Sequence, residues 1–103
     1  MNKGTIRHMA VFTLKSAPDS DKTQAFLREG AEILSAIPGV DHFEVLDQVS
    51  GKCEFQYAFC MEFADQAAYD AYNVHPDHQA FVAERWDTEV AAFQEIDFVK
   101  AAV

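Results

Sequence analysis

The residues best suited to chemistry lie together in the stretch YNVHPDHQAF, at positions 72–81. Pro76 ends one helix and fits the first position of the next, because proline lacks the amide hydrogen that a helix interior needs. A bend at Pro76 would turn the phenol of Tyr72 toward the imidazole of His78. Such a pair can enolise a ketone, since one group takes the α-proton while the other holds the developing enolate.

His78 would lie near the third position of the second helix, where the helix dipole disfavours a charged imidazolium. A neutral ring there can accept a proton. The structural alternative is that His78 caps the helix start or satisfies a buried hydrogen bond. For Tyr72 the alternative is an aromatic core position with its hydroxyl group satisfied at the rim.

The other polar residues of this stretch have simpler interpretations. His75 precedes the proline and can bond nearby backbone, and Asp77 would stabilise the dipole in the first helical turn. Zinc accepts two histidines three residues apart, but no acidic or cysteine ligand stands at a recognisable offset from His75 and His78. We therefore expect neither a metal nor another cofactor.

A mostly apolar stripe at helical spacing predicts that the last helix runs from Pro76 through Phe93. Phe81 and Trp86 lie on this stripe and are expected in the core and in the wall of a ligand pocket. Arg85 is its unusual member. It can pair with Glu89 four residues later, pack its stem while its head reaches water, or hold a ligand carboxylate or enolate.

Periodicity along the rest of the chain predicts four strands and two further helices. The first strand alternates so that His8 shares a face with Ile6 and Phe12, where it lines the pocket or makes a core hydrogen bond. A first helix begins after Asp19 or Ser20, and Asp65 caps a short second one. The expected strands are 6–14, 40–49, 55–63 and 95–101.

The order βαββααβ predicts an α+β, ferredoxin-like fold, with a four-stranded antiparallel sheet and helices on one face. The strand at 55–63 is apolar on both faces, as in a strand that is covered on both sides. One helix layer covers only one face of the sheet. We therefore expect a homodimer that joins two sheets into a dimeric α/β barrel.

Length and charge limit the number of domains and the possible classes of partner. The 103 residues predict a single domain, 1–103, and a net charge of −9 disfavours nucleic-acid and membrane-surface partners. The chain has no apparent signal peptide or membrane span and is expected in the cytoplasm. Cys53 and Cys60 are seven residues apart, on opposite faces of one strand, which argues against a disulfide between them.

Three segments, IRHMAVFTL, IPGV and YDAYNVHPDHQAF, resemble in order the stress-responsive A/B-barrel (Dabb) family. The resemblance implies a dimeric α+β barrel with a pocket between each protomer's helices and sheet. The family includes stress-induced or structural proteins, members without assigned activity, and a plant polyketide cyclase that performs a cofactor-free aldol condensation. The cyclase's catalytic tyrosine and histidine match Tyr72 and His78, a pocket-lining histidine matches His8, and an architectural histidine matches His75.

Two functional hypotheses follow. In the first, a pocket binds a small hydrophobic or carbonyl-containing molecule, and Tyr72, His78 and His8 perform cofactor-free acid/base chemistry as a cyclase, isomerase or lyase. In the second, the chain is a non-catalytic stress-responsive or structural protein whose HPxH motif shapes the helix break. A cofactor-free monooxygenase, suggested by the related dimeric-barrel superfamily, rests on architecture alone.

Overall fold

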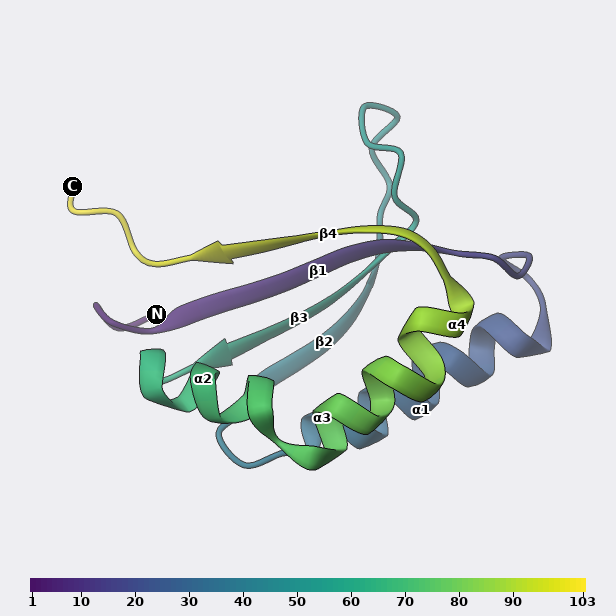
Figure 1. The fold of residues 1–103 in the computed structure, drawn as a ribbon. Helices are drawn as coiled ribbons and strands as arrows, with labels where there is room; N and C mark the ends of the chain where they lie inside the picture. Colours follow the sequence, from purple (N-terminus) through teal and green to yellow (C-terminus); the bar gives the residue numbers. More distant parts are fainter.

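A four-stranded antiparallel sheet with helices along one face makes up the computed structural model, which describes all 103 residues (Figure 1). The strands are β1 (Ile6–Leu14), β2 (Asp41–Asp47), β3 (Tyr57–Phe63) and β4 (Val90–Phe98), in the spatial order β2-β3-β1-β4. The helices are α1 (Asp21–Ser35), α2 (Gln66–Val74), α3 (Pro76–Phe81), the π-helical segment η1 (Val82–Trp86) and α4 (Asp87–Glu89). The expected ferredoxin-like fold is confirmed.

Local chain chemistry sets the helix ends. The hydroxyl group of Ser20 accepts a hydrogen bond from the amide of Thr23 and begins α1, and the carboxylate of Asp65 does the same for α2 through Ala68. Pro76 stands at the start of α3, as expected. No helix combines the length and the apolar character needed to cross a membrane.

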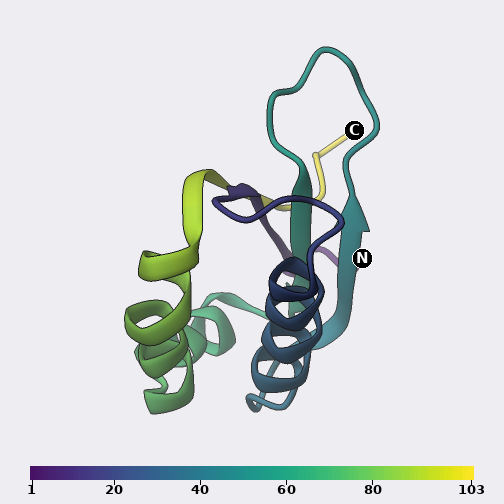
Figure 2. The same ribbon diagram turned by 90° about the vertical axis from the view of Figure 1, so that its right-hand side faces the viewer.

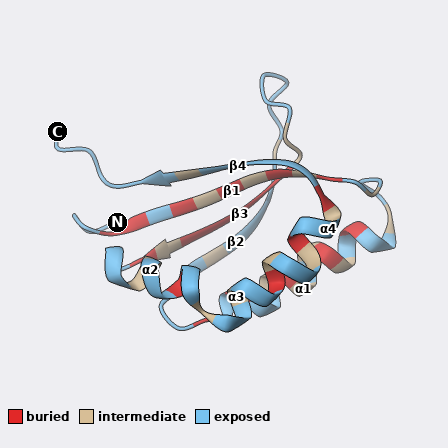
Figure 3. Ribbon diagram, viewed as in Figure 1, coloured by how far each residue is buried: buried red, intermediate tan, exposed pale blue.

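The core lies between the sheet and the helices, and Figure 3 shows buried residues on the facing sides of both layers. β3 is buried along almost its whole length, on both faces, as its composition predicts. Figure 2 views the molecule along the sheet, with α1 beside the run of α2 to α4. The opposite face of the sheet carries no helix, and its central side chains Met9, Val11 and Ile96 remain half-exposed.

The prediction for the end of the chain is wrong in one respect. The last helix stops at Glu89, and β4 begins at Val90 rather than at residue 95, so Phe93 lies on a strand. In isolation the segment 90–93 suits a helix. In the structure it pairs instead with the C-terminal end of β1, with a bulge between Thr13 and Leu14. Tertiary pairing overrides the local preference here.

Candidate functional site

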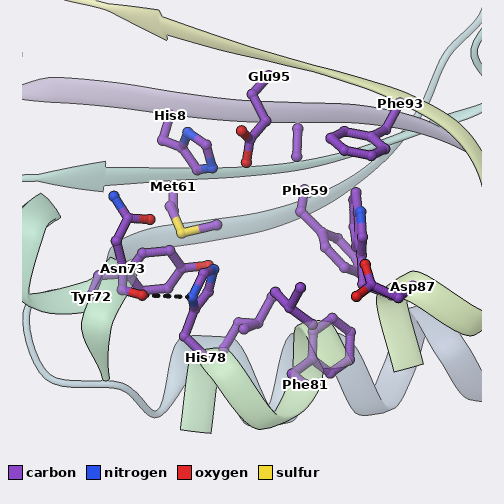
Figure 4. Close-up of a pocket in the computed structure, with 14 residues that line it drawn as sticks. His8, Phe59, Met61, Tyr72, Asn73, His78, Phe81, Asp87, Phe93 and Glu95 are labelled. Atoms are coloured by element: carbon purple, nitrogen blue, oxygen red, sulfur yellow. Dashed lines mark hydrogen bonds between the residues drawn. The ribbon is translucent and has the colours of Figure 1, made fainter. Parts of the chain in front are cut away.

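A cavity of about 330 Å³ lies between the sheet and the helix layer. Its walls come from β1, β3, β4, the end of α1 and the helical run that starts with α2, and most of its lining residues are apolar (Figure 4). Phe93 and Glu95 on β4 are exposed and form part of its rim. Five of the six predicted site residues line this cavity: His8, Tyr72, His78, Phe81 and Trp86.

His78 is held at the cavity wall by the helix break itself. Its Nδ1 atom lies 3.2 Å from the backbone carbonyl oxygen of Asn73, in the last turn of α2. Because a carbonyl only accepts, Nδ1 carries the proton and Nε2 of the neutral ring keeps its lone pair. Burial lowers the pKa of His78, so the neutral ring that can accept a proton is favoured.

Tyr72 packs against His78, with ring centroids 4.4 Å apart. Its side chain is 2% exposed, yet its hydroxyl group forms no hydrogen bond within the protein, to His78 or to any other residue. Burial is also the main reason that the pKa of Tyr72 is raised, which keeps the phenol protonated. A hydroxyl group at a cavity wall that has no partner in the protein is available as a hydrogen-bond donor to a ligand.

His8 is both a cavity-lining residue and a core hydrogen bonder. Its Nδ1 atom lies 2.6 Å from Oδ1 of Asp97, and the Tyr69 hydroxyl group donates to Oδ2 of the same carboxylate at 2.9 Å. Nδ1 therefore donates to Asp97, leaving Nε2 as the acceptor. The pKa of Tyr69 is raised by burial first and by Asp97 second.

Sequence reasoning missed Asp97, Tyr69 and Glu95. The pairing of β1 with β4 sets His8 opposite Asp97 and Ala10 opposite Glu95, so both carboxylates share the helix-covered face with His8. Both carboxylates lie in the strand expected at 95–101, so the sequence locates the strand but not its register against β1. Tyr69 stands three residues before Tyr72, a spacing that places both on one helix face.

Arg85 does not line the cavity. Its guanidinium donates to Glu89 at 2.6 Å and to Glu29 at 2.9 Å, on the far side of the helical run. Of the three alternatives for Arg85, the structure contains the i,i+4 pair. The pairing with two carboxylates leaves it out of the site.

His75 lies at the boundary between α2 and α3, outside the cavity. Its Nδ1 atom accepts a hydrogen bond from the amide of Asp77 at 3.1 Å, which caps the start of α3. This contact agrees with the architectural role that the HPxH motif suggests. No group of three or more histidine, cysteine, aspartate or glutamate side chains is arranged to hold a metal ion.

Fold and cavity together define a ferredoxin-like α+β protein with a histidine-lined pocket under its sheet. The model of the stress responsive A/B barrel domain (Dabb) family matches residues 6–100. The chain is 56% identical to a Dabb family protein of ferredoxin-like fold from Mesorhizobium loti, over 96% of this chain and 99% of that one, with a TM-score of 0.95. The chain belongs to this family.

Two more distant structures share the fold. A dimeric ferredoxin-like protein of unknown function from Thermobifida fusca is 22% identical, over 95% of this chain and 93% of that one, with a TM-score of 0.75. The hydroxynitrile lyase from Passiflora edulis is 12% identical, over 99% of this chain and 98% of that one, with a TM-score of 0.82. A comparison with curated proteins finds no match.

Proposed function

We propose that the protein binds a small, largely apolar carbonyl compound in this cavity and catalyses cofactor-free proton transfer on it, as a cyclase, isomerase or lyase. The observation that carries the proposal is the pairing of a proton acceptor with a free donor. His78 has its Nδ1 atom occupied by the Asn73 carbonyl, while the hydroxyl group of the buried residue Tyr72, on the adjacent ring, has no partner in the protein.

The roles follow from these two groups. Nε2 of His78 takes a proton from the carbon next to the carbonyl, and the electron pair of that C–H bond forms the carbon–carbon double bond of an enolate. The carbonyl π electrons move to oxygen, which accepts the hydrogen bond of Tyr72. The enolate carbon is then reprotonated by His78 or attacks a second carbonyl carbon. The acceptor Nε2 of His8 offers a second proton relay on the opposite wall.

The alternative, a non-catalytic structural protein, predicts a filled interior with the tyrosine and histidine both bonded to backbone. Only His78 meets that expectation, and the cavity is open. The hydroxynitrile lyase from Passiflora edulis has the same fold, so this fold is compatible with lyase chemistry.

We further propose that the protein works as a homodimer joined through the uncovered sheet face. Met9, Val11 and Ile96 at the centre of that face are apolar and half-exposed in the single chain. The dimeric relative of this fold supports the same arrangement.

Solvent exchange of α-protons tests the proposed reaction without knowledge of the natural substrate. Benzylacetone and acetophenone, two neutral apolar ketones, are incubated with the protein in deuterated water, and loss of the α-proton signals is followed by NMR. We expect exchange above the buffer rate. Since loss of a general base lowers rates by about 10²–10⁴-fold and loss of an oxyanion donor by about 10²–10³-fold, His78→Ala and Tyr72→Phe should abolish this excess.

His42→Asn is the matched control. His42 is exposed and lies outside the cavity, and its backbone has φ 53°, a left-handed conformation that asparagine tolerates. The control should exchange both ketones as the wild type does. If wild type and His78→Ala protein exchange them at equal rates, His78 is not the base and the proposal fails.

A further inference from the structure

The charged groups of the cavity are all of one sign. Glu95 on β4 and Asp87 at the start of α4 line it, and no lysine or arginine does. Asp97 adds a third carboxylate directly behind His8. An anionic ligand would therefore enter a pocket whose fixed charges repel it.

Two of these carboxylates are unsatisfied within the protein. Both oxygens of Asp97 are engaged, one by His8 and the other by Tyr69. Glu95 and Asp87, by contrast, form no side-chain hydrogen bond and no ion pair. In Figure 4 the Glu95 side chain reaches from β4 toward the cavity, between His8 and Phe93. Each of these carboxylates is free to accept a hydrogen bond from a ligand.

Two basic side chains that contact the helical run, Arg85 on the run and Lys15 just after β1, are committed elsewhere. Arg85 binds Glu29 and Glu89 on the other side of the helix. Lys15 donates to the backbone carbonyl of Thr88 at 3.0 Å. Neither side chain lines the cavity, so neither neutralises its carboxylates there.

Aromatic side chains form much of the wall beside these carboxylates. Trp86, the residue before Asp87, lies edge-to-face with Phe93 at a centroid distance of 5.5 Å. Phe81 and Tyr72 add further aromatic surface. Aromatic faces attract organic cations through their quadrupole, and nearby carboxylates strengthen that preference.

A second, independent feature shows that the pocket is built to receive a polar group. Tyr72 is 2% exposed, and its hydroxyl group has no hydrogen-bond partner although it borders the cavity. The cavity thus presents one free hydroxyl group and two free carboxylates within an aromatic wall.

We propose that the cavity selects an apolar ligand bearing an amine, whose ammonium group is received by Glu95, while Asp87 at the other end of the cavity adds to its negative potential, and that it discriminates against carboxylates and phosphates. This inference rests on the proposed function only in placing the ligand in the same cavity. It narrows the substrate class to aminated or neutral carbonyl compounds.

Three probes that share one phenyl-alkyl skeleton test it: phenethylammonium, phenethyl alcohol and hydrocinnamate. Dissociation constants are measured by NMR titration of the ¹⁵N-labelled protein at low ionic strength. We expect the ammonium probe to bind at least about tenfold more tightly than the carboxylate, which corresponds to about 1.4 kcal/mol. Glu95→Gln should reduce that ratio at least threefold and Asp87→Asn should reduce it by less, while the alcohol changes little.

Glu84→Gln is the matched control, because it removes the same charge from the same helical run outside the cavity. The inference is overturned if hydrocinnamate binds as tightly as phenethylammonium, if no probe binds, or if Glu84→Gln reduces the ratio as much as Glu95→Gln. A protein that exchanges ketone α-protons but does not discriminate among the probes refutes this inference alone. Discrimination without exchange refutes the proposed reaction alone.

Discussion

The imidazole of His8 and the carboxylate of Asp97 face each other across neighbouring strands, with Nδ1 2.6 Å from Oδ1. His8 is buried on β1, whereas Asp97 lies near the end of the exposed strand β4. The Tyr69 hydroxyl group holds the second oxygen of the carboxylate. This arrangement fixes the ring of His8 with Nδ1 as donor, so its remaining nitrogen can accept a proton on the cavity side.

Removing the carboxylate of Asp97 should leave the imidazole ring of His8 free to change its orientation. In Asp97→Ala, Nδ1 loses a charge-assisted hydrogen bond of about 1.5–3 kcal/mol, and the ring then samples other tautomers and rotamers. We expect ¹⁵N NMR to show a mixture of His8 tautomers in the variant, against the Nδ1–H form in the wild type. Ketone α-proton exchange should fall at least about 10-fold, because the lower end of this range already corresponds to about a factor of ten in rate.

Tyr69→Phe is a milder change to compare with Asp97→Ala. It removes the bond to the carboxylate and a longer contact of 3.1 Å with Nδ1 of His8, and it leaves the bond of 2.6 Å between His8 and Asp97 in place. Its tautomer pattern should stay close to the wild type. If Asp97→Ala leaves His8 in the same single tautomer, Asp97 is not its positioning residue.

The low pKa of His78 determines how activity should depend on acidity. Burial has the largest effect and lowers this pKa. The Asn73 carbonyl and Glu95 raise the pKa, and the nearby His8 and His75 lower it. The basic form therefore persists to more acidic conditions than in a free histidine, whose pKa is about 6.5. We expect the rising limb of α-proton exchange against pH to have its midpoint below that value.

The lowered pKa of His78 should also make the free energy of unfolding depend on pH. The unfolded chain takes up a proton at His78 before the folded protein does, so acidification through the ordinary histidine range favours unfolding. His78→Asn carries no such proton, and the difference in unfolding free energy between the two proteins should shift against the wild type as pH falls. Denaturant titrations at a series of pH values measure this difference. An unchanged difference would show that the histidine is not desolvated in the folded protein.

Dimerisation can be tested at the centre of the uncovered sheet face. Met9 pairs with Ile96 there, and a lysine at Met9 would place a charge in the proposed sheet-to-sheet contact. We expect wild-type protein to sediment as a dimer at micromolar concentration and Met9→Lys to sediment as a monomer. Val74→Lys changes an exposed valine on α2, in the helix layer, and should leave the dimer intact. A monomeric wild type would contradict the proposed homodimer.

The accuracy of the sequence-based predictions depended on how local each signal was. Ser20, Asp65 and Pro76 mark helix ends through contacts within a few residues, and all three were identified correctly. The alternation of β1 likewise placed His8 on the helix-covered face. Such features are determined by neighbours along the chain and are readable from it.

The rest of the site depends on strand register, which local periodicity does not specify. Phe93 fits the helical stripe and also a strand, and only pairing with β1 decides between them. The strand expected at 95–101 includes Glu95 and Asp97, but its alternation does not specify which face they share with His8, and only the pairing with β1 decides this. The three alternatives for Arg85 stay open in the sequence for a related reason, since its contact with Glu29 on α1 is a tertiary property.

Gly30 affects both the packing of the core and the shape of the cavity. It lies within α1, and a methyl group added there would stand 2.8 Å from Cζ of Phe59 and 3.1 Å from Cζ of Phe81. Both rings line the cavity. Gly30→Ala gains about 1 kcal/mol of helix propensity but overpacks the core by about 1–3 kcal/mol. We expect a net loss of stability in denaturant titration, and weaker binding of phenethylammonium as the rings are displaced.

A double-mutant cycle with Phe59→Leu separates crowding from other effects. Leucine lacks the ring atoms that crowd Gly30, so Gly30→Ala should destabilise the Phe59→Leu protein less than it destabilises the wild type. The coupling free energy between the two sites should therefore be favourable. If Gly30→Ala is equally unfavourable in both backgrounds, contact with Phe59 is not the reason for a glycine in the middle of α1.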